Sequence, residues 1–321
     1  MNFNYIKGGV TAPKGFLASG IHCGLKKSNL KKDLALIYSE VPAAASGMFT
    51  KNKVKGAPIS ISKDHLSNKK AQAIIVNSGN ANTCNGTDGL NKAKKMTCLQ
   101  AKELNLKADD ILVASTGVIG VPLNIDAIKS GIPLLTQKLS KEGHDDASSA
   151  IMTTDTVKKE LALEFTIGDK VVTIGAMAKG SGMIEPNMGT MLSFITTDIA
   201  ITPELLDEAL KSCVKVTYNR VSVDGDTSTN DSVFILANGL AENNLISEKN
   251  EDYETFLKAL TDLNTIMARN IAKDGEGATK LLECKISGAK TEEDASILGK
   301  SVINSPLVKT AMFGSNNTII W

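Results

Sequence analysis

The stretch "KGSGMIEPNMGTML" at residues 179–192 decides how the fold is interpreted, because it fits no regular element. It joins the apolar run "VVTIGAMA" (171–178) to a second apolar run that begins at Met191. It has no helical period and no strand alternation, and its glycines and Pro186 favour an irregular loop. The loop therefore presents Thr190, directly after Gly189, at the start of a predicted buried strand.

Short apolar runs on both sides of this loop predict further strands, since such runs bounded by turn residues are typical of a buried sheet. The predicted strands are "AQAIIVN" (71–77), "ILVAS" (111–115), "SVFILAN" (232–238) and "KLLECKIS" (280–287). The runs "LALEFTIG" (161–168) and 171–178 flank Asp169-Lys170, which predicts a hairpin.

Apolar residues at helical spacing predict helices between these strands. Thr202 as a cap and Pro203 in the first turn predict a helix start. Pro133 is expected to split the helical segment 125–139 in two. The remaining predicted helices cover 90–104, 253–271 and 291–304. Because strands and helices mix without strict alternation, the sequence predicts an α/β (α+β) layered sandwich of mixed sheets and helices.

The composition is that of an ordinary globular protein with one large domain or two. The chain has 321 residues, of which 42% are hydrophobic and 22% charged, and its net charge is +1. A net charge this small gives no electrostatic case for nucleic acid or a membrane surface as a partner. The sequence shows no signal peptide and no apolar run long enough to span a bilayer, so we expect a cytoplasmic protein.

Cysteines and histidines give no pattern typical of a metal site. The five cysteines are scattered without a C-x-x-C pair, which favours reduced thiols in a cytosol. His22, His65 and His144 lie far apart in the sequence. We therefore expect no bound metal.

Two glycine-rich stretches follow predicted strands, but neither matches a phosphate-binding motif. They are "NSGNANTCNGTDG" (77–89) and "STGVIG" (115–120), and tight turns are favoured for both. In the second stretch a sharp turn would expose the Gly117 amide beside the Thr116 hydroxyl, and two convergent donors can form an oxyanion hole. The acidic stretch "DGDTSTND" (224–231) lacks the spacing of a calcium loop and is predicted to form turns that support the site.

The Gly189-Thr190 bond allows a specific chemistry. A threonine hydroxyl is a poor nucleophile without a neighbouring base, and an N-terminal threonine carries such a base as its own amine. An internal threonine reaches that state when its Oγ attacks the preceding carbonyl, the acyl group shifts from N to O, and water hydrolyses the ester. From the loop alone, self-cleavage and an ordinary surface loop both remain open.

The same loop resembles the signature of the bifunctional ornithine acetyltransferase/glutamate N-acetyltransferase family of arginine biosynthesis. Other blocks resemble that family in the same order along nearly the whole chain. These blocks are "GGVTAPKGFLASGIHCGLKK" (8–27), "IIVNSGNANTCNG" (74–86), "VASTGVIG" (113–120), "AIMTTDT" (150–156), "VDGDTSTND" (223–231), "IAKDGEGATK" (271–280) and "SPLVKTAMFGS" (305–315). The resemblance implies a precursor that cuts itself into 1–189 and 190–321, with a second, smaller α/β domain in the later region.

The resemblance also implies the roles of individual residues. Thr190 is the implied nucleophile, Thr116 and Gly117 the oxyanion residues, and Thr156, Lys179 and Glu276 the substrate contacts together with Thr190. The implied reaction moves an acetyl group from N-acetylornithine to Thr190, releases ornithine, and passes the acetyl group to glutamate. It needs no resident cofactor, although acetyl-CoA is open as a second acetyl donor. The implied assembly of the cleaved chains is an α2β2 heterotetramer.

The sequence departs from the family pattern at two places. Gly189 stands where alanine is usual, and after "AMFGS" the family usually continues, whereas this sequence ends at Trp321. We therefore expect the chain to lack the C-terminal segment of the family. Two other hypotheses remain open: a threonine-nucleophile amidohydrolase or aminopeptidase that uses water as acceptor, and an inactive truncated remnant.

Overall fold

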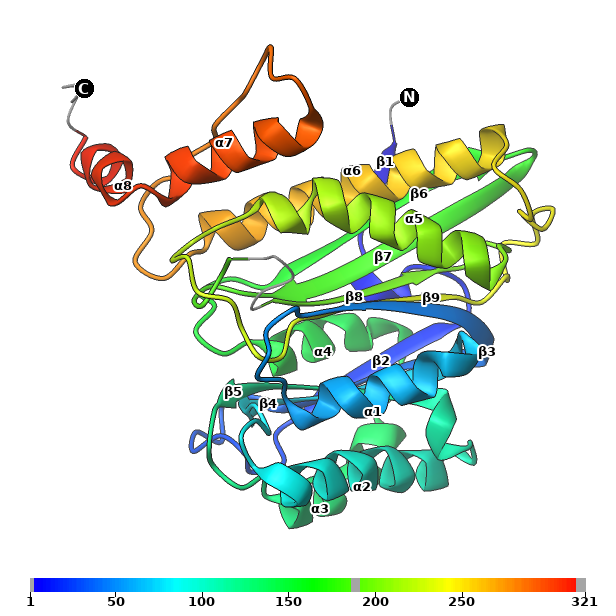
Figure 1. Cartoon of the computed structure of the whole chain (residues 1–321). Coiled ribbons are helices and arrows are strands. Elements are labelled where there is room, and N and C mark those ends of the chain that lie inside the picture. The colour runs from blue at the N-terminus through cyan, green and yellow to red at the C-terminus, as the bar shows by residue number, and fades with distance from the viewer. Residues whose placement is uncertain (1–2, 186–190, 316–321) are drawn as a thin grey trace.

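The fold is built on one mixed sheet, shown in the computed structural model of Figure 1. The structure describes residues 3–185 and 191–315, and within these ranges the sheet has nine strands in the order β1-β6-β7-β8-β9-β3-β4-β5, with β2 paired to β3 off this path. The strands are β1 (Asn4–Ile6), β2 (Phe16–Ile21), β3 (Leu34–Phe49), β4 (Lys70–Asn80), β5 (Ile111–Val118), β6 (Lys159–Ile167), β7 (Lys170–Lys179), β8 (Leu192–Thr197) and β9 (Ser232–Ala237). The pairs β4–β5 and β8–β9 are parallel, which confirms a mixed sheet.

Helices cover the sheet in layers (Figure 1). They are α1 (Ala57–His65), α2 (Gly86–Leu104), α3 (Ile125–Gln137), α4 (His144–Ile151), α5 (Pro203–Val216), α6 (Glu251–Lys273), α7 (Glu292–Asn304) and α8 (Pro306–Phe313). Helices α5 and α6 pack on the half that contains β6 to β9, α1 to α3 cover the half that contains β4 and β5, and α4 lies between the halves. The predicted layered sandwich of sheet and helices is thereby confirmed.

The long strand β3 connects the two halves. Its first part, Leu34 to Tyr38, pairs with both β2 and β4, whereas residues 44–49 pair with β9. An irregularity between Tyr38 and Ala43 lets the strand change direction. The buried apolar side chains accordingly form separate clusters beneath α5–α6, around α4, and beneath α2–α3.

Most predicted elements are present, with two differences in detail. The hairpin forms, but Ile167 pairs with Lys170, so its two turn residues are Gly168 and Asp169 rather than Asp169 and Lys170. Gly168 adopts φ 58°, a value that glycine accepts at low cost. The expected break at Pro133 is wrong, because α3 continues through it. Pro133 lies on the exposed face, where the carbonyl that loses its partner is open to water.

The predicted strand at 280–287 is also wrong. The segment is extended but pairs with no strand among the described residues. Leu282 and Ile286 instead line a pocket with Ala268 and Ala272 of α6. Alternating apolar residues make a strand only when a neighbouring backbone supplies the ladder, and here the neighbours are helices.

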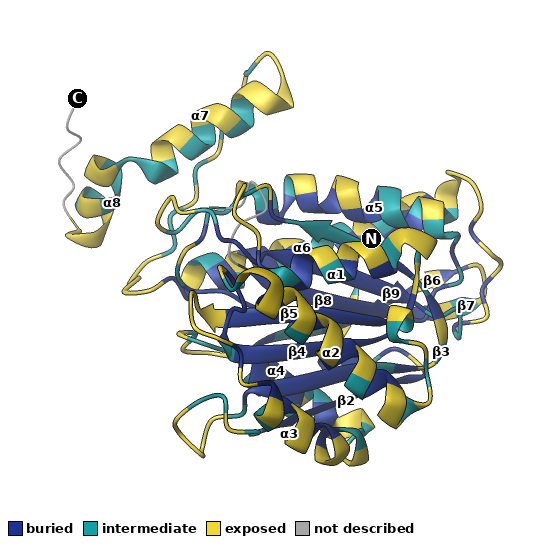
Figure 2. Cartoon of the chain, turned by 60° about the horizontal axis from the view of Figure 1, so that its bottom comes forward, coloured by how far each residue is buried: buried dark blue, intermediate teal, exposed yellow. Residues whose placement is uncertain are grey.

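Helices α7 and α8 extend away from the body of the molecule and bury none of their residues (Figure 2). Their apolar side chains, such as Ile297, Leu307 and Phe313, are more than half exposed. Within 3–185 and 191–315, none of the helices is both long enough and apolar enough to cross a membrane.

The sheet register brings together the ends of the elements that carry the predicted site. Lys179, the last residue of β7, pairs with Leu192, the first residue of β8. Leu192 in turn pairs with Ser232, the first residue of β9. The residues that directly precede Leu192 and Ser232 therefore lie at the same end of the sheet.

Candidate active site

The predicted cut site, Gly189-Thr190, lies outside the described residues. The next residues along the chain are described: Met191 is buried, and Leu192 begins β8 beside Lys179. The other sequence-predicted site residues are therefore compared with this end of β7 and β8.

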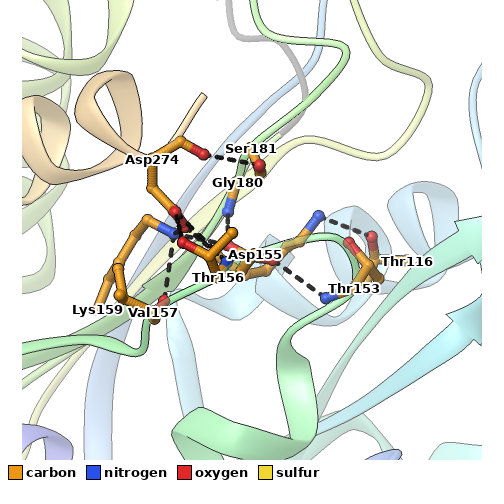
Figure 3. Close-up of polar contacts among 10 residues, drawn as sticks. Thr116, Thr153, Asp155, Thr156, Val157, Lys159, Gly180, Ser181 and Asp274 are labelled. Atoms are coloured by element: carbon orange, nitrogen blue, oxygen red, sulfur yellow. Dashed lines mark hydrogen bonds and ion pairs between the residues drawn. The ribbon is translucent and has the colours of Figure 1, made fainter. Parts of the chain in front are cut away.

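Thr116 and Gly117 lie near the end of β5, as expected. Gly117 has φ 130°, and a Cβ atom there would lie 2.3 Å from the carbonyl carbon of Gly79 in β4. Only glycine fits this conformation and this close approach. The Lys179 Nζ donates to the Thr116 Oγ1 across 3.3 Å, a contact drawn in Figure 3. Since Thr116 accepts this bond, its own hydroxyl proton is free to be donated elsewhere.

Lys179 lies buried at the end of β7, with only 3% of its surface exposed. Burial lowers the pKa of its ammonium group, while the carboxylates of Asp155 and Asp231 oppose this effect. A buried lysine of this kind is placed to meet an anionic group in a site closed to water. The structure thus brings Thr116, Gly117 and Lys179 together, although they come from different strands.

Thr156 belongs to a buried ion network that the sequence analysis did not predict (Figure 3). Its amide N donates to the carboxylate of Asp274 at 3.0 Å, and its hydroxyl donates to the same carboxylate. The Lys159 Nζ bridges Asp274 at 2.6 Å and Asp155 at 2.7 Å. Asp155 also accepts from the Gly180 amide at 2.7 Å, which ties the network to the residue after Lys179.

Burial alone would raise the pKa values of Asp155 and Asp274, but nearby cations and hydrogen bonds reverse the direction. The pKa of Asp155 is lowered by Lys179 and Lys159, and that of Asp274 by hydrogen bonds from Lys159 and Thr156. Both carboxylates are therefore ionised at neutral pH and act as hydrogen-bond acceptors.

Glu276 lies two residues beyond Asp274, after the end of α6. Its amide N donates to the Ser181 carbonyl at 2.9 Å, and the Ser181 hydroxyl donates to the Asp274 carbonyl at 2.7 Å. A Cβ atom on Gly182 would lie 2.4 Å from the Glu276 carboxyl carbon, so that exposed carboxylate covers Gly182. The structure therefore places Glu276 beside the loop that leads to the predicted cut.

The acidic stretch 224–231 holds this loop from both ends, which confirms its predicted supporting role. The Asp224 carboxylate accepts from the amides of Met183 and Ile184, at 2.5 Å and 2.8 Å. The Asp231 carboxylate accepts from the Met191 amide at 2.8 Å. The specific importance of Asp231 was missed, although its position directly before a predicted strand gave a signal.

Asp231 is almost completely buried, with 1% of its surface exposed. Its Oδ2 atom has no hydrogen-bond partner among the residues that the structure describes. Burial raises the pKa of this carboxyl well above its usual range. A buried carboxyl with a raised pKa is typical of functional sites, because it can exchange a proton near neutral pH.

Metal-ligating residues do not gather in the described part of the chain. Over 3–185 and 191–315, no three side chains of the histidine, cysteine, aspartate and glutamate types come close enough together to hold an ion.

The fold first places the chain in a structural class. An L-aminopeptidase D-Ala-esterase/amidase from Ochrobactrum anthropi, described as a new variant among the Ntn hydrolase fold, aligns with a TM-score of 0.52. The alignment covers 84% of this chain and 86% of that chain at 11% sequence identity, so it shows the shared fold alone. The protein therefore has an Ntn-hydrolase-like layered α/β fold.

Sequence comparison then gives the family: the ArgJ family model matches residues 17–319, and the chain belongs to the ArgJ family. The "Arginine biosynthesis bifunctional protein ArgJ" of Caldanaerobacter subterraneus is 51% identical over 97% of this chain and 77% of its own length. The ArgJ 1 protein of Clostridium acetobutylicum is 54% identical over 94% of this chain and 74% of its own length.

A solved relative of known activity also aligns with the chain. The ornithine acetyltransferase of Mycobacterium tuberculosis, solved in complex with ornithine, aligns with a TM-score of 0.54 at 37% identity. The alignment covers 58% of this chain and 98% of that chain.

Proposed function

We propose that this chain transfers the acetyl group of N2-acetyl-L-ornithine to L-glutamate, with Thr190 as the nucleophile. As a member of the ArgJ family it is an acyltransferase of arginine biosynthesis. The observation that carries the proposal is the bond from Lys179 to Thr116, which leaves the Thr116 proton free beside the Gly117 amide. Two such donors suit the oxyanion that forms when Thr190 attacks an acetyl carbonyl.

The nucleophile is formed by cleavage of the Gly189-Thr190 bond. Thr190 Oγ attacks the Gly189 carbonyl, and the ester forms as the C–N bond breaks and frees the Thr190 amine. Water then hydrolyses the ester, which leaves a carboxylate on Gly189 and a free hydroxyl on Thr190, with the new amine as its base. The division into 1–189 and 190–321 is supported by the solved M. tuberculosis relative. The alignment covers 98% of that chain but only 58% of this chain. The residues that precede Thr190 make up a similar share of this chain.

Cleavage at this bond leaves the two segments joined through the sheet. Strand β8 from the second segment pairs with β7 from the first over six residue pairs, and β9 pairs with β3 over six more. These ladders hold the cleaved chains together, and two such pairs form the proposed α2β2 assembly.

The substrates are zwitterionic amino acids, and the candidate contacts fit their charges. Lys179 pairs with a substrate carboxylate, Glu276 pairs with the side-chain ammonium of ornithine, and Thr156 contacts the polar end of the substrate. Acetyl-CoA serves as a second acetyl donor in this proposal, and no resident cofactor is needed. Unpaired thiols at all five described cysteines suit the proposed location in the cytoplasm.

The test combines a denaturing gel with N-terminal sequencing of the smaller fragment. The wild type should give two bands, with the smaller beginning at Thr190, whereas Thr190→Ala should give one band and no transfer. Thr190→Ser keeps a hydroxyl and is the matched control, expected to cleave. A cut elsewhere, or transfer that survives in Thr190→Ala, contradicts the proposal.

The acceptor separates this function from the two other hypotheses. Acetylglutamate formed from acetylornithine and glutamate supports transfer, whereas free acetate alone indicates an amidohydrolase. A chain that neither cuts itself nor gains thermal stability from ornithine is an inactive remnant, since a specific ligand raises stability by mass action.

A further inference from the structure

We infer that Asp274 is a positioning residue that turns the Thr156 hydroxyl into an acceptor for an N–H group of the substrate. The inference rests on the proposed function, because Thr156 contacts substrate only if the site is the one proposed. It goes beyond that function by assigning a role to Asp274 and a direction to the Thr156 hydrogen bond.

The first step is the direction of the bond. Asp274 is ionised, so its carboxylate can only accept, and the Thr156 hydroxyl must donate its single proton to it. The Thr156 amide donates to the same carboxylate at 3.0 Å and fixes the residue from a second side. With its proton committed, the Thr156 oxygen presents only lone pairs to a ligand. It therefore selects an N–H donor and disfavours a carboxylate.

The second step is that Asp274 is itself held in place. Its side chain is 6% exposed and pairs with Lys159, whose side chain is 1% exposed and also pairs with the buried Asp155 carboxylate. The Ser181 hydroxyl holds the Asp274 carbonyl at 2.7 Å. Asp274 comes from the end of α6, and Thr156 from the segment before β6, so the contact spans the predicted cut between residues 189 and 190.

The third step concerns charge. Lys179 already supplies a buried amino group that can donate to the substrate carboxylate in the proposed function. An amino-acid substrate also carries an ammonium or amide N–H, and the acceptor at Thr156 gives that group a partner of the opposite kind. If both residues contact the substrate as proposed, the donor suits its carboxylate and the acceptor suits its N–H group. A substrate bound the other way round would place its carboxylate against the Thr156 lone pairs.

The experiment measures ornithine binding by calorimetry, since ornithine has no acetyl group and cannot turn over. Asp274→Asn keeps the shape of the side chain, but its amide nitrogen can donate to Thr156 and reverse the bond. Thr156→Val removes only the hydroxyl. Each variant should weaken binding by roughly 10- to 100-fold, the worth of one hydrogen bond to a charged group. Thr156→Ser keeps the hydroxyl and should bind within about threefold of the wild type.

The double variant Thr156→Val/Asp274→Asn separates positioning from a general structural effect. If Asp274 acts through Thr156, the double variant should bind ornithine no more weakly than whichever single variant has the lower affinity. Independent, additive losses would overturn the inference, as would wild-type affinity in Asp274→Asn. Asp145→Asn is the control, because Asp145 forms an exposed ion pair with Lys158 in the same region.

The outcomes for the inference and for the proposed function are distinguishable. Acetyl transfer by the wild type, with unchanged ornithine affinity in Asp274→Asn, overturns the inference and keeps the function. Ornithine binding that depends on Asp274, without any acetyl transfer, keeps the inference and overturns the function. Absence of ornithine binding in the wild type overturns both.

Discussion

Replacing Gly117 with alanine tests whether the end of β5 is built around a residue without a side chain. The new Cβ would lie 2.3 Å from the carbonyl carbon of Gly79 and 2.5 Å from the amide nitrogen of Asn80. Both atoms are backbone, so neither can rotate away. The strands β4 and β5 would have to separate at the point where Thr116 accepts from Lys179.

Two contributions set the magnitude. A non-glycine residue at φ 130° is strained by about 1–3 kcal/mol. Forcing one carbon into a filled space adds about 1–3 kcal/mol. Gly120→Ala is the matched control, because Gly120 also has positive φ, 77°, but a Cβ there meets no atom within 4 Å. Gly117→Ala should therefore lower the free energy of unfolding by about 2 kcal/mol more than Gly120→Ala does.

Activity gives the second readout. A displaced oxyanion donor costs about 3 kcal/mol of transition-state stabilisation, so acetyl transfer should fall by about 100-fold in Gly117→Ala. Urea unfolding and initial rates at saturating substrate would measure the two effects. Equal stability losses in the two alanine variants, together with a near-normal rate in Gly117→Ala, would refute the reasoning.

Three further substitutions follow from the structure. Lys159→Met leaves two buried carboxylates without their shared cation and should lower the free energy of unfolding by about 3–5 kcal/mol. Lys158→Met is the control: it breaks an exposed pair and should change this free energy by about 1 kcal/mol or less. Urea titration measures both. Burial lowers the pKa of Lys26 from 10.5 to about 8, so between these pH values the unfolded chain binds more protons than the folded chain. The free energy of unfolding should therefore rise with pH across this window, and Lys26→Met should flatten the rise. An identical slope in both proteins would contradict this prediction. Pro133→Ala restores a hydrogen-bond donor inside α3 and should raise the free energy of unfolding by about 1–3 kcal/mol, while a lower melting temperature would count against this.

The sequence predicted the elements whose burial leaves a clear pattern. Strands β4, β5 and β9 are nearly continuous apolar runs because both of their faces are buried, and α6 has a clear helical stripe because one of its faces is buried. The long strand β3 was not predicted. Its middle, around Glu40 and Pro42, interrupts the apolar pattern at the point where the strand leaves one half of the sheet for the other.

The candidate site was predicted in its parts but not in its connections. Thr116 and Gly117 could be named from a motif at the end of a predicted strand, whereas Lys179 was named from the family resemblance. The pairing of Lys159 with Asp274 joins residues 115 positions apart in the sequence, and no local pattern reports such a contact. The wrong prediction of a strand at 280–287 has the same cause, because alternating apolar residues do not show whether a neighbouring strand exists to pair with.

Several ionisable side chains are buried at this end of the sheet. Lys159, Lys179, Asp155, Asp231 and Asp274 each expose less than a tenth of their side chains or surface. Apolar residues of similar size would often stabilise a fold equally well or better than buried ion pairs. Stability therefore does not account for this arrangement. In the proposed function the arrangement is accounted for by a site that must hold a zwitterion, because polar groups that are already oriented bind such a ligand without having to reorganise when it arrives.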